Sequence, residues 1–210
     1  MKLYDSKVSL NSRRVRMFLA EKGITIEKEE CWADGKSCLR EDFLARYPFR
    51  LIPMLELDDG RQIGESTAIC RYFEELYPEP SLFGRDALEK ALVEMWHQRV
   101  HTDGEIGAEE VVRNSFPPMA QRGLAGTAEL VAQIPALVKR GKRRLLRCFH
   151  VLNTQLTTQQ FVAGARFSMA DITTLCAVDF AKFAAIEMPL ELHHLARWYG
   201  EISTRASASV

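Results

Sequence analysis

Two adjacent residues with side chains suited to ligand binding, Glu65 and Ser66, stand at the predicted start of a helix in the stretch ESTAICRYFEELY. Free backbone N–H groups and the helix dipole at such a start favour a carboxylate ligand. The Ser66 hydroxyl can add a hydrogen-bond donor, and the Glu65 carboxylate can accept from an ammonium group. The pair therefore predicts a site for the α-carboxylate and α-ammonium groups of an amino acid. The simpler alternative is that Ser66 only caps the helix.

A proline, Pro53, directly precedes the predicted strand MLEL. Proline is tolerated at a strand edge or a bulge, and a cis bond before it makes a fixed turn. If the Ile52–Pro53 bond is cis, the backbone N–H and C=O groups of Ile52 face outward. They can then pair with an extended ligand as a neighbouring strand would. The alternative is a turn without a ligand.

The elements that must position these residues are predicted within residues 1–80. KLYDS predicts a short strand, SRRVRMFLAEKG a helix that ends at Gly23, and ITIEKEECW a strand over residues 24–32. A helix between two strands implies that the strands are parallel. MLELDDGRQIG predicts a hairpin that turns at Asp59-Gly60. The last helix of this region should bury the apolar residues Ala68, Ile69, Tyr72, Phe73 and Leu76.

A stretch rich in proline and glycine, PEPSLFG, predicts a linker, and no strand pattern of any length follows it. We therefore predict an α/β domain over residues 1–78, a linker over 79–85 and an all-helical domain over 86–210. In the helical domain, Ser168 and Asp171 have the spacing of a capping box before an apolar helix that should be buried. The first helix of this domain should pack through Leu88, Leu92, Met95, Trp96 and Val100.

The charge balance and the cysteines restrict the classes of function. Lys and Arg total 28, as do Asp and Glu, so the net charge is zero, whereas a nucleic-acid binder is expected to be strongly basic. The basic stretch VKRGKRRLLR is more typical of a solvated helix face. No apolar run approaches the roughly 18 residues of a membrane span, and no metal-binding motif occurs. The first residues lack a signal-peptide pattern, and five scattered cysteines favour reduced thiols in a cytoplasmic protein.

Taken together, these features resemble the glutathione S-transferase superfamily, in particular its bacterial, serine-type, theta- or zeta-like cytosolic members. The resemblance rests on LIPMLEL, ESTAICRYFEELYPEP and GARFSMADIT, and it spans essentially the whole chain. It implies a thioredoxin-like βαβ-ββα domain followed by an all-helical domain, a homodimer, and glutathione as co-substrate without a metal. In the family the proline is cis, the residue before it pairs with the cysteinyl backbone of glutathione, and the Glu-Ser pair holds the γ-glutamyl end. By position these roles fall on Pro53, Ile52, Glu65 and Ser66.

The nucleophile that this resemblance implies is the glutathione thiol, whose ordinary pKa of about 8.5 leaves little thiolate at neutral pH. Lowering that pKa by about two units requires roughly 2.7 kcal/mol of preferential stabilisation of the anion. A hydroxyl donor beside a helix N-terminus can supply part of it. Matching SLNSRRVR to the serine-using classes assigns this role to Ser9, with Asn11 and Ser12 as alternates. The alternative for Ser9 is an N-cap or loop serine.

The sequence departs from the family at the glycyl end of the expected glutathione site. Relatives often carry a lysine or glutamine two residues before the cis-proline, where this chain has Leu51, which cannot donate a hydrogen bond. The neighbouring Arg50 is a candidate to compensate. Lys7 and Leu10 replace prolines that are common in bacterial relatives, so weakened glutathione affinity or lost activity is an alternative outcome.

The second substrate is expected between the two domains, where the first helix of the helical domain offers Trp96 and Arg99 on one face and His97 and His101 on another. We therefore expect a transferase that delivers the glutathione thiolate to an apolar electrophilic small molecule. Two alternatives stay open: a glutathione-dependent disulfide reductase or isomerase, and a non-catalytic binding or regulatory protein. A nucleic-acid binder that acts through residues 138–147 is disfavoured. The fold alone does not identify the physiological substrate.

Overall fold

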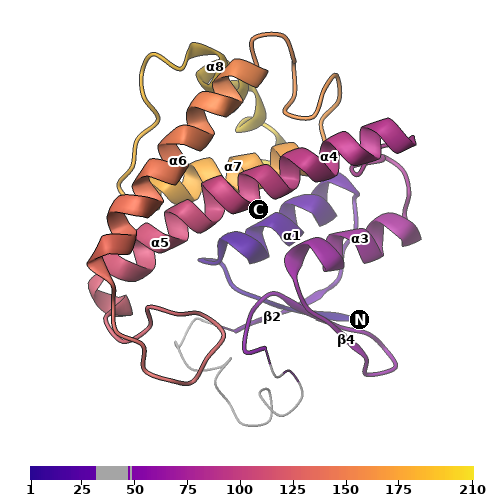
Figure 1. Ribbon diagram of the computed structural model, residues 1–210. Helices are drawn as coiled ribbons and strands as arrows, with labels where there is room; N and C mark the ends of the chain where they lie inside the picture. Colours follow the sequence, from indigo (N-terminus) through magenta and orange to yellow (C-terminus); the bar gives the residue numbers. More distant parts are fainter. Residues whose placement is uncertain (32–46, 48) are drawn as a thin grey trace. The chain divides into compact units, whose positions relative to one another are not determined.

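The computed structural model describes residues 1–31, Tyr47 and residues 49–210, which form two compact units (Figure 1). The first unit comprises Met1–Pro80, Ala125–Ala128 and Val210, and the second comprises Ser81–Leu124 and Glu129–Ser209. Strands and helices alternate in the first unit, whereas the regular elements of the second are helices. The predicted fold class, a thioredoxin-like α/β domain followed by a helical domain, is confirmed.

A four-stranded sheet organises the first unit. Its strands in spatial order are β2 (Glu27–Glu30), β1 (Lys2–Asp5), β3 (Met54–Glu56) and β4 (Gln62–Ile63). The parallel pair β1 and β2 is connected through α1 (Leu10–Glu21), as predicted, whereas β3 is antiparallel to both β1 and β4. The hairpin at Asp59-Gly60 is also confirmed. Gly60 has a φ of 84°, a left-handed conformation that glycine adopts without a steric penalty.

The second strand is shorter than predicted. β2 spans Glu27–Glu30, so Ile24 and Ile26 precede it rather than belong to it. The pairing of β2 with β1 runs only from Lys2 opposite Glu27 to Asp5 opposite Glu30, and the strand is limited to these paired residues.

Helix α3 (Ser66–Leu76) packs against α1 and completes the first unit (Figure 1). Ile69 and Phe73 are buried as predicted, but Ala68 and Leu76 are exposed. Ala68 lies about 100° around the helix from Ile69, and Leu76 is the last helical residue. The buried stripe is therefore narrower than the apolar pattern indicates.

The second unit consists of five α-helices and short π- and 3-10-helical turns within the described residues. The α-helices are α4 (Ala87–Val100), α5 (Ile106–Ser115), α6 (Pro135–Gln155), α7 (Met169–Phe183) and α8 (His193–Ile202). The π-helical turn is His101–Glu105, and the 3-10 turns are Pro117–Met119 and Ala206–Ser209. Helix α5 packs against α6, and α4 packs against α7.

The predicted capping box at the start of α7 is confirmed, and the helix is buried along most of its length. Asp171 accepts hydrogen bonds from the Ser168 backbone N–H at 3.0 Å and from the Val162 N–H at 2.9 Å. The indole N–H of Trp198 on α8 donates to the same carboxylate at 2.9 Å. A single buried side chain therefore connects the start of α7 with the preceding loop and with α8.

The packed face of α4 differs from the prediction. Its buried residues are Val93, His97 and Val100. Leu88 and Met95, which were expected to pack, are exposed. The buried face includes a histidine because His97 Nδ1 lies 2.8 Å from Thr173 Oγ1 of α7, which satisfies the imidazole inside the unit. Apolar residues occur on both faces of α4, so periodicity alone could not select the buried one.

Candidate functional site

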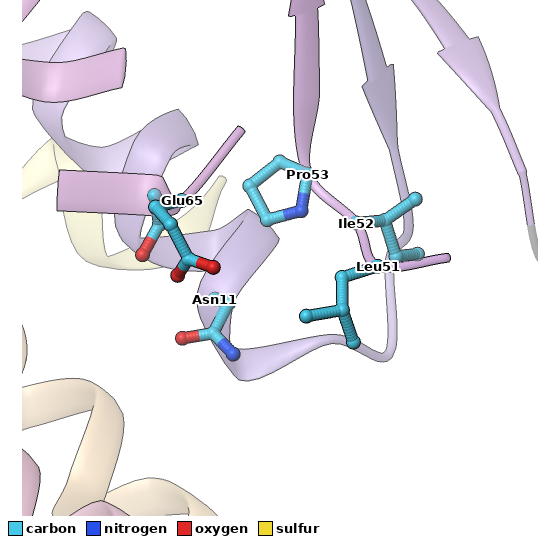
Figure 2. A pocket seen from close by; sticks show the side chains of 6 residues that line it. Asn11, Leu51, Ile52, Pro53 and Glu65 are labelled. Atoms are coloured by element: carbon cyan, nitrogen blue, oxygen red, sulfur yellow. The ribbon is translucent and has the colours of Figure 1, made fainter. Parts of the chain in front are cut away.

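A small pocket in the first unit brings together residues from three segments of the chain (Figure 2). It encloses about 40 Å³ of free space. The residues that line it are Asn11, Leu51, Ile52, Pro53, Glu65 and Ser66. Asn11 comes from the first turn of α1, residues 51–53 precede β3, and Glu65 and Ser66 begin α3. All six stand among the residues that the sequence singles out as functional or as departures from the family pattern.

The peptide bond between Ile52 and Pro53 is cis, as the resemblance implied. Pro53 is buried, and Ile52 is half-buried at the pocket wall. The next residue, Met54, begins β3 and pairs with Tyr4 of β1. The sheet therefore fixes the strand end at which Ile52 borders the pocket.

Glu65 occupies the N-cap position of α3 with a φ of 62° and a ψ of 116°. A non-glycine residue with such a positive φ typically costs about 1–3 kcal/mol and persists only where the surroundings hold it. The side chain makes no capping hydrogen bond and is exposed beside the pocket (Figure 2). The carboxylate therefore lies at the pocket and does not cap its own helix.

Tyr47 packs beside this strained junction. Its side chain is buried with Tyr4, Cys31 and Met54. Burial raises the pKa of the Tyr47 phenol, and the negative charge of Glu65 raises it further. The phenol is therefore neutral over the physiological pH range.

A buried arginine, Arg14 of α1, connects two of the residues that line the pocket. Its Nη1 donates to Ser66 Oγ at 2.5 Å and to Asn11 Oδ1 at 3.0 Å. Arg14 is only 2% exposed. The sequence reasoning missed this residue. The sequence does show three arginines within the apolar helix SRRVRMFL. This pattern does not indicate which arginine is buried or which residues that arginine contacts.

Ser9 is the N-cap of α1, which agrees with the alternative that the sequence left open for it. Its Oγ accepts from the Ser12 N–H at 3.3 Å, and the residue is not among those that line the pocket. Ser12 is fully buried, and its own Oγ accepts from the Ser6 N–H at 3.2 Å. Of the three candidates for thiolate stabilisation, Asn11 is the one that lines the pocket.

Three further candidates do not line the pocket. Arg50 adopts a φ of 54° directly before Leu51. Arg99 of α4 donates to Asp103 Oδ2 at 3.2 Å, and Trp96 of the same helix is half-buried. Trp96 and Arg99 belong to the second unit, and their contact with a second substrate stays a prediction.

Three of the six basic residues in the stretch at 138–147 of α6 pair with carboxylates within the second unit. Arg140 and Arg144 donate to Glu110 of α5 at 2.6 and 3.2 Å. Arg147 donates to Asp103 at 2.7 Å. Both carboxylates are buried, and such charge-assisted hydrogen bonds are the strong ones. Arg140, Arg144 and Arg147 therefore have partners inside the protein, which is more than the solvated helix face that the sequence predicts.

The described cysteines are buried: Cys31, Cys70, Cys148 and Cys176. Cys38 lies outside the described residues. Burial and the charge of Asp103 raise the pKa of Cys148 to about 12, so its thiolate is not populated at neutral pH. Within the described part of the chain, no cluster of three or more His, Cys, Asp or Glu residues could hold a metal ion. None of the helices in this same part is long and apolar enough to cross a membrane.

Comparisons with known proteins cover both units. Residues 3–81 match the family model described as the glutathione S-transferase N-terminal domain, and residues 118–206 match the glutathione S-transferase C-terminal domain. The chain is 31% identical to glutathione S-transferase 2 of Saccharomyces cerevisiae over an alignment of 211 positions that covers 99% of this chain and 87% of that protein. It is 38% identical to a maleylacetoacetate isomerase of Pseudomonas aeruginosa over 93 residues, or 43% of this chain and 44% of that protein.

Comparison with solved structures points to the same family as the sequence comparisons. The crystal structure of a glutathione S-transferase domain-containing protein from Marinobacter aquaeolei matches with a TM-score of 0.89 at 33% identity, covering 99% of this chain and 100% of that one. Sequence and fold therefore match this family over nearly the full length of the chain. On these grounds the chain belongs to the glutathione S-transferase family.

Proposed function

We propose that the chain binds glutathione in the pocket beside the cis-proline. The observation that carries this proposal is the convergence of the cis Ile52–Pro53 bond with Glu65 and Ser66 around one pocket. The Ile52 backbone pairs with the cysteinyl residue of glutathione, Ser66 donates to the γ-glutamyl α-carboxylate, and Glu65 accepts from the α-ammonium group. Membership of a family named for glutathione supports the same ligand.

We assign stabilisation of the glutathione thiolate to Ser9, with Asn11 as the alternate donor. As an N-cap, Ser9 uses an oxygen lone pair to accept from the Ser12 N–H. Its hydroxyl hydrogen remains able to donate, so capping and thiolate stabilisation are compatible. Asn11 is favoured by its place in the pocket lining, and its amide can also donate. Ser12 is the weakest candidate because it is fully buried and bound to the Ser6 N–H.

The reaction that fits this site is transfer of the glutathione sulfur to an apolar electrophile. The thiolate forms a bond to an electrophilic carbon, and a leaving group departs with its electron pair. Trp96 and Arg99 are the candidate contacts of the electrophile. A second candidate, glutathione-dependent isomerisation, is favoured by the relative that is a maleylacetoacetate isomerase. A glutathione-dependent disulfide reductase has no separate observation in its favour.

A non-catalytic role is the alternative from a different class. It is favoured by Leu51, an apolar residue that lines the pocket where relatives often place a donor for the glycyl end of glutathione. The Arg50 side chain is the candidate to replace that donor. A non-catalytic role predicts weak glutathione binding without turnover.

We further propose a cytoplasmic homodimer that uses the exposed face of α4. Leu88 and Met95 are 69% and 52% exposed, and Leu92 lies between them on the same face. A second copy of the chain is the partner that the family favours for this apolar face. Light scattering should give the mass of a dimer for the wild type and of a monomer for Leu88→Lys with Met95→Lys. A monomeric wild type at micromolar concentration would contradict the proposal.

The first experiment is a calorimetric titration of the purified chain with reduced glutathione, repeated on Glu65→Ala. The matched control is Glu75→Ala, which removes the same charge from an exposed position on α3. Binding to the wild type and the control, but not to Glu65→Ala, would support the site. If the wild type shows neither heat nor thermal stabilisation at millimolar glutathione, the proposed function is wrong.

Turnover is the second measurement, because binding alone does not separate an enzyme from a non-catalytic member. The wild type is incubated with glutathione and a chlorodinitrobenzene, and the thioether product is quantified against the uncatalysed rate. A parallel assay follows cis-trans isomerisation of a maleyl compound. Product in the first assay supports the transferase, product in the second alone supports the isomerase, and binding without either supports the non-catalytic role.

A further inference from the structure

The guanidinium of Arg14 is a buried charge directly behind the pocket. The residue is 2% exposed and does not itself line the pocket. A buried cation is costly unless hydrogen bonds replace its lost hydration. Two of those hydrogen bonds go to Ser66 and Asn11, and both of these residues do line the pocket. The buried charge and the ligand-facing side chains are thus directly connected.

The hydrogen bond from Arg14 determines how Ser66 can use its hydroxyl group. A guanidinium only donates, so Ser66 Oγ must be the acceptor in their 2.5 Å contact. The hydroxyl hydrogen of Ser66 is then available to a different acceptor. Because Ser66 lines the pocket, a group bound in the pocket can be that acceptor. Contact with a cation also polarises the O–H bond and makes it a stronger donor. Ser66 therefore favours an anionic acceptor.

The same guanidinium determines the orientation of the Asn11 side chain. Only the carbonyl oxygen of an amide can accept from Arg14 Nη1, and the Oδ1 atom does so at 3.0 Å. The amide nitrogen is therefore on the other side of the group, and Figure 2 shows it on the side of Leu51. Asn11 consequently offers N–H donors to a pocket ligand.

We infer that Arg14 is a positioning residue that makes Ser66 and Asn11 hydrogen-bond donors toward the pocket and so gives the site its preference for anionic groups. This inference rests on the proposed glutathione function. The anionic groups are then the γ-glutamyl α-carboxylate for Ser66 and, for Asn11 acting as a donor alongside Ser9, the cysteinyl thiolate. Glu65 remains the acceptor for the ammonium group. The pocket would thus divide its ligand into an anionic side set by Arg14 and a cationic side set by Glu65.

The test compares glutathione with two analogues, each lacking one charge at the γ-glutamyl end. Glutaryl-cysteinylglycine keeps the carboxylate and lacks the ammonium group, whereas 4-aminobutyryl-cysteinylglycine keeps the ammonium group and lacks the carboxylate. Dissociation constants are measured by calorimetry for the wild type and for Arg14→Met. The control Arg13→Met removes the same charge from the adjacent residue of α1, which does not line the pocket.

Arg14→Met should weaken glutathione and the glutaryl analogue by about tenfold or more, because a hydrogen bond to a charged group is lost. Binding of the aminobutyryl analogue, which has no carboxylate, should change by less than about threefold. Glu65→Ala should give the reverse ranking of the two analogues. In a double-mutant cycle, Ser66→Ala should add little to Arg14→Met, because both remove the same interaction.

The effect on the thiol provides a second readout that a merely structural arginine would not alter. The ultraviolet absorbance of the thiolate is followed against pH for glutathione bound to each variant. Arg14→Met and Asn11→Ala should both raise the pKa of the bound thiol, whereas Arg13→Met should not. If Arg14→Met does not fold, Arg14→Lys replaces it. Its ammonium lacks the planar fork and should give the same ranking of ligands with a smaller loss.

The outcomes separate this inference from the proposed function. If the wild type binds none of the three tripeptides, both are overturned. If the wild type binds glutathione but Arg14→Met weakens all three ligands equally and leaves the thiol pKa unchanged, the inference alone is overturned. Arg14 would then be a residue that supports folding. Selective loss for the two ligands that carry the carboxylate supports it.

Discussion

The ring of Tyr47 occupies the space in which a side chain on Gly64 would have to lie. An ideal Cβ on Gly64 would be 1.8 Å from Tyr47 Oη and 2.7 Å from its Cζ. Tyr47 is 3% exposed, so its ring has little room to move. Gly64 directly precedes Glu65, whose positive φ places its carboxylate beside the pocket. The absence of a side chain at position 64 is therefore a packing requirement of the candidate site.

Gly64→Ala should consequently destabilise the protein and weaken glutathione binding. Overpacking of this kind typically costs about 1–3 kcal/mol, which urea unfolding would measure. Gly200→Ala is the matched control, because a Cβ there meets nothing within 4 Å and alanine favours the helix. In a Tyr47→Leu background, the cost of Gly64→Ala should shrink. An equal cost in both backgrounds would show that Tyr47 is not the obstacle.

Asp171→Asn should strongly destabilise the helical unit. The carboxylate accepts from four donors, which are the N–H groups of Val162 and Ser168, the Ser168 hydroxyl and the Trp198 indole. An asparagine amide would turn N–H donors toward some of these N–H groups, and an unsatisfied buried polar group costs about 1–3 kcal/mol. Thermal unfolding of this variant is compared with Glu191→Gln, which alters an exposed carboxylate. Equal melting temperatures of the two variants would contradict the expectation.

The pH dependence of stability should also reveal Asp171. Burial raises the pKa of this carboxyl from 3.8 to about 6, because the donors around it only partly offset the loss of hydration. A pKa that is higher in the folded than in the unfolded state means that the folded state binds the proton more tightly. The resulting stabilisation is complete below about pH 4 and is lost as the pH rises through about 6.

The free energy of unfolding of the wild type, minus that of Asp171→Asn, should therefore fall between about pH 4 and about pH 7. The shift of the Asp171 pKa from 3.8 to about 6 corresponds to about 3 kcal/mol, which is the largest decrease expected in this difference. Urea titrations of both proteins at several pH values give this difference directly, and other titrating groups largely cancel in it. A difference that rises with pH would contradict a raised pKa.

Substitution of Ser9 should separate its two possible roles. Ser9→Gly and Ser9→Ala both remove the hydroxyl group, but glycine preserves most of the N-cap whereas alanine costs about 1 kcal/mol. If Ser9 stabilises the thiolate, both variants should lower kcat with little change in glutathione affinity. If it is only a cap, Ser9→Gly should keep full activity. A loss of activity confined to Asn11→Ala would transfer the role to Asn11.

Restoring a donor at position 51 should strengthen the glycyl end of the site. Leu51 lines the pocket, and a glutamine there resembles the residue that relatives often carry. Leu51→Gln should increase glutathione affinity by up to about tenfold, as expected for one hydrogen bond to a carboxylate. γ-Glutamylcysteine, which lacks the glycyl residue, is the matched ligand and should show no gain. An equal gain for both ligands would place the new contact elsewhere.

Local chemistry explains why much of this protein could be predicted from its sequence. A proline before a strand, glycine at a hairpin turn and a capping box are signals that act within a few residues. They correctly indicated the turn at Gly60 and the start of α7 after Ser168, whereas the cis bond at Pro53 was implied by the family resemblance and left as a condition by the local sequence. The Glu65-Ser66 pair likewise stands at the start of its helix as predicted, although the Glu65 side chain makes no capping hydrogen bond there.

Contacts between residues far apart in the sequence were decided only by the tertiary structure. The buried face of α4 depends on the pairing of His97 with Thr173, and β2 is limited to the residues that pair with β1. The link from Arg14 to Ser66 spans 52 positions and has no local signature. Which of several polar residues faces a ligand is determined by such contacts, because the low dielectric of the interior forces each buried polar group to find a specific partner.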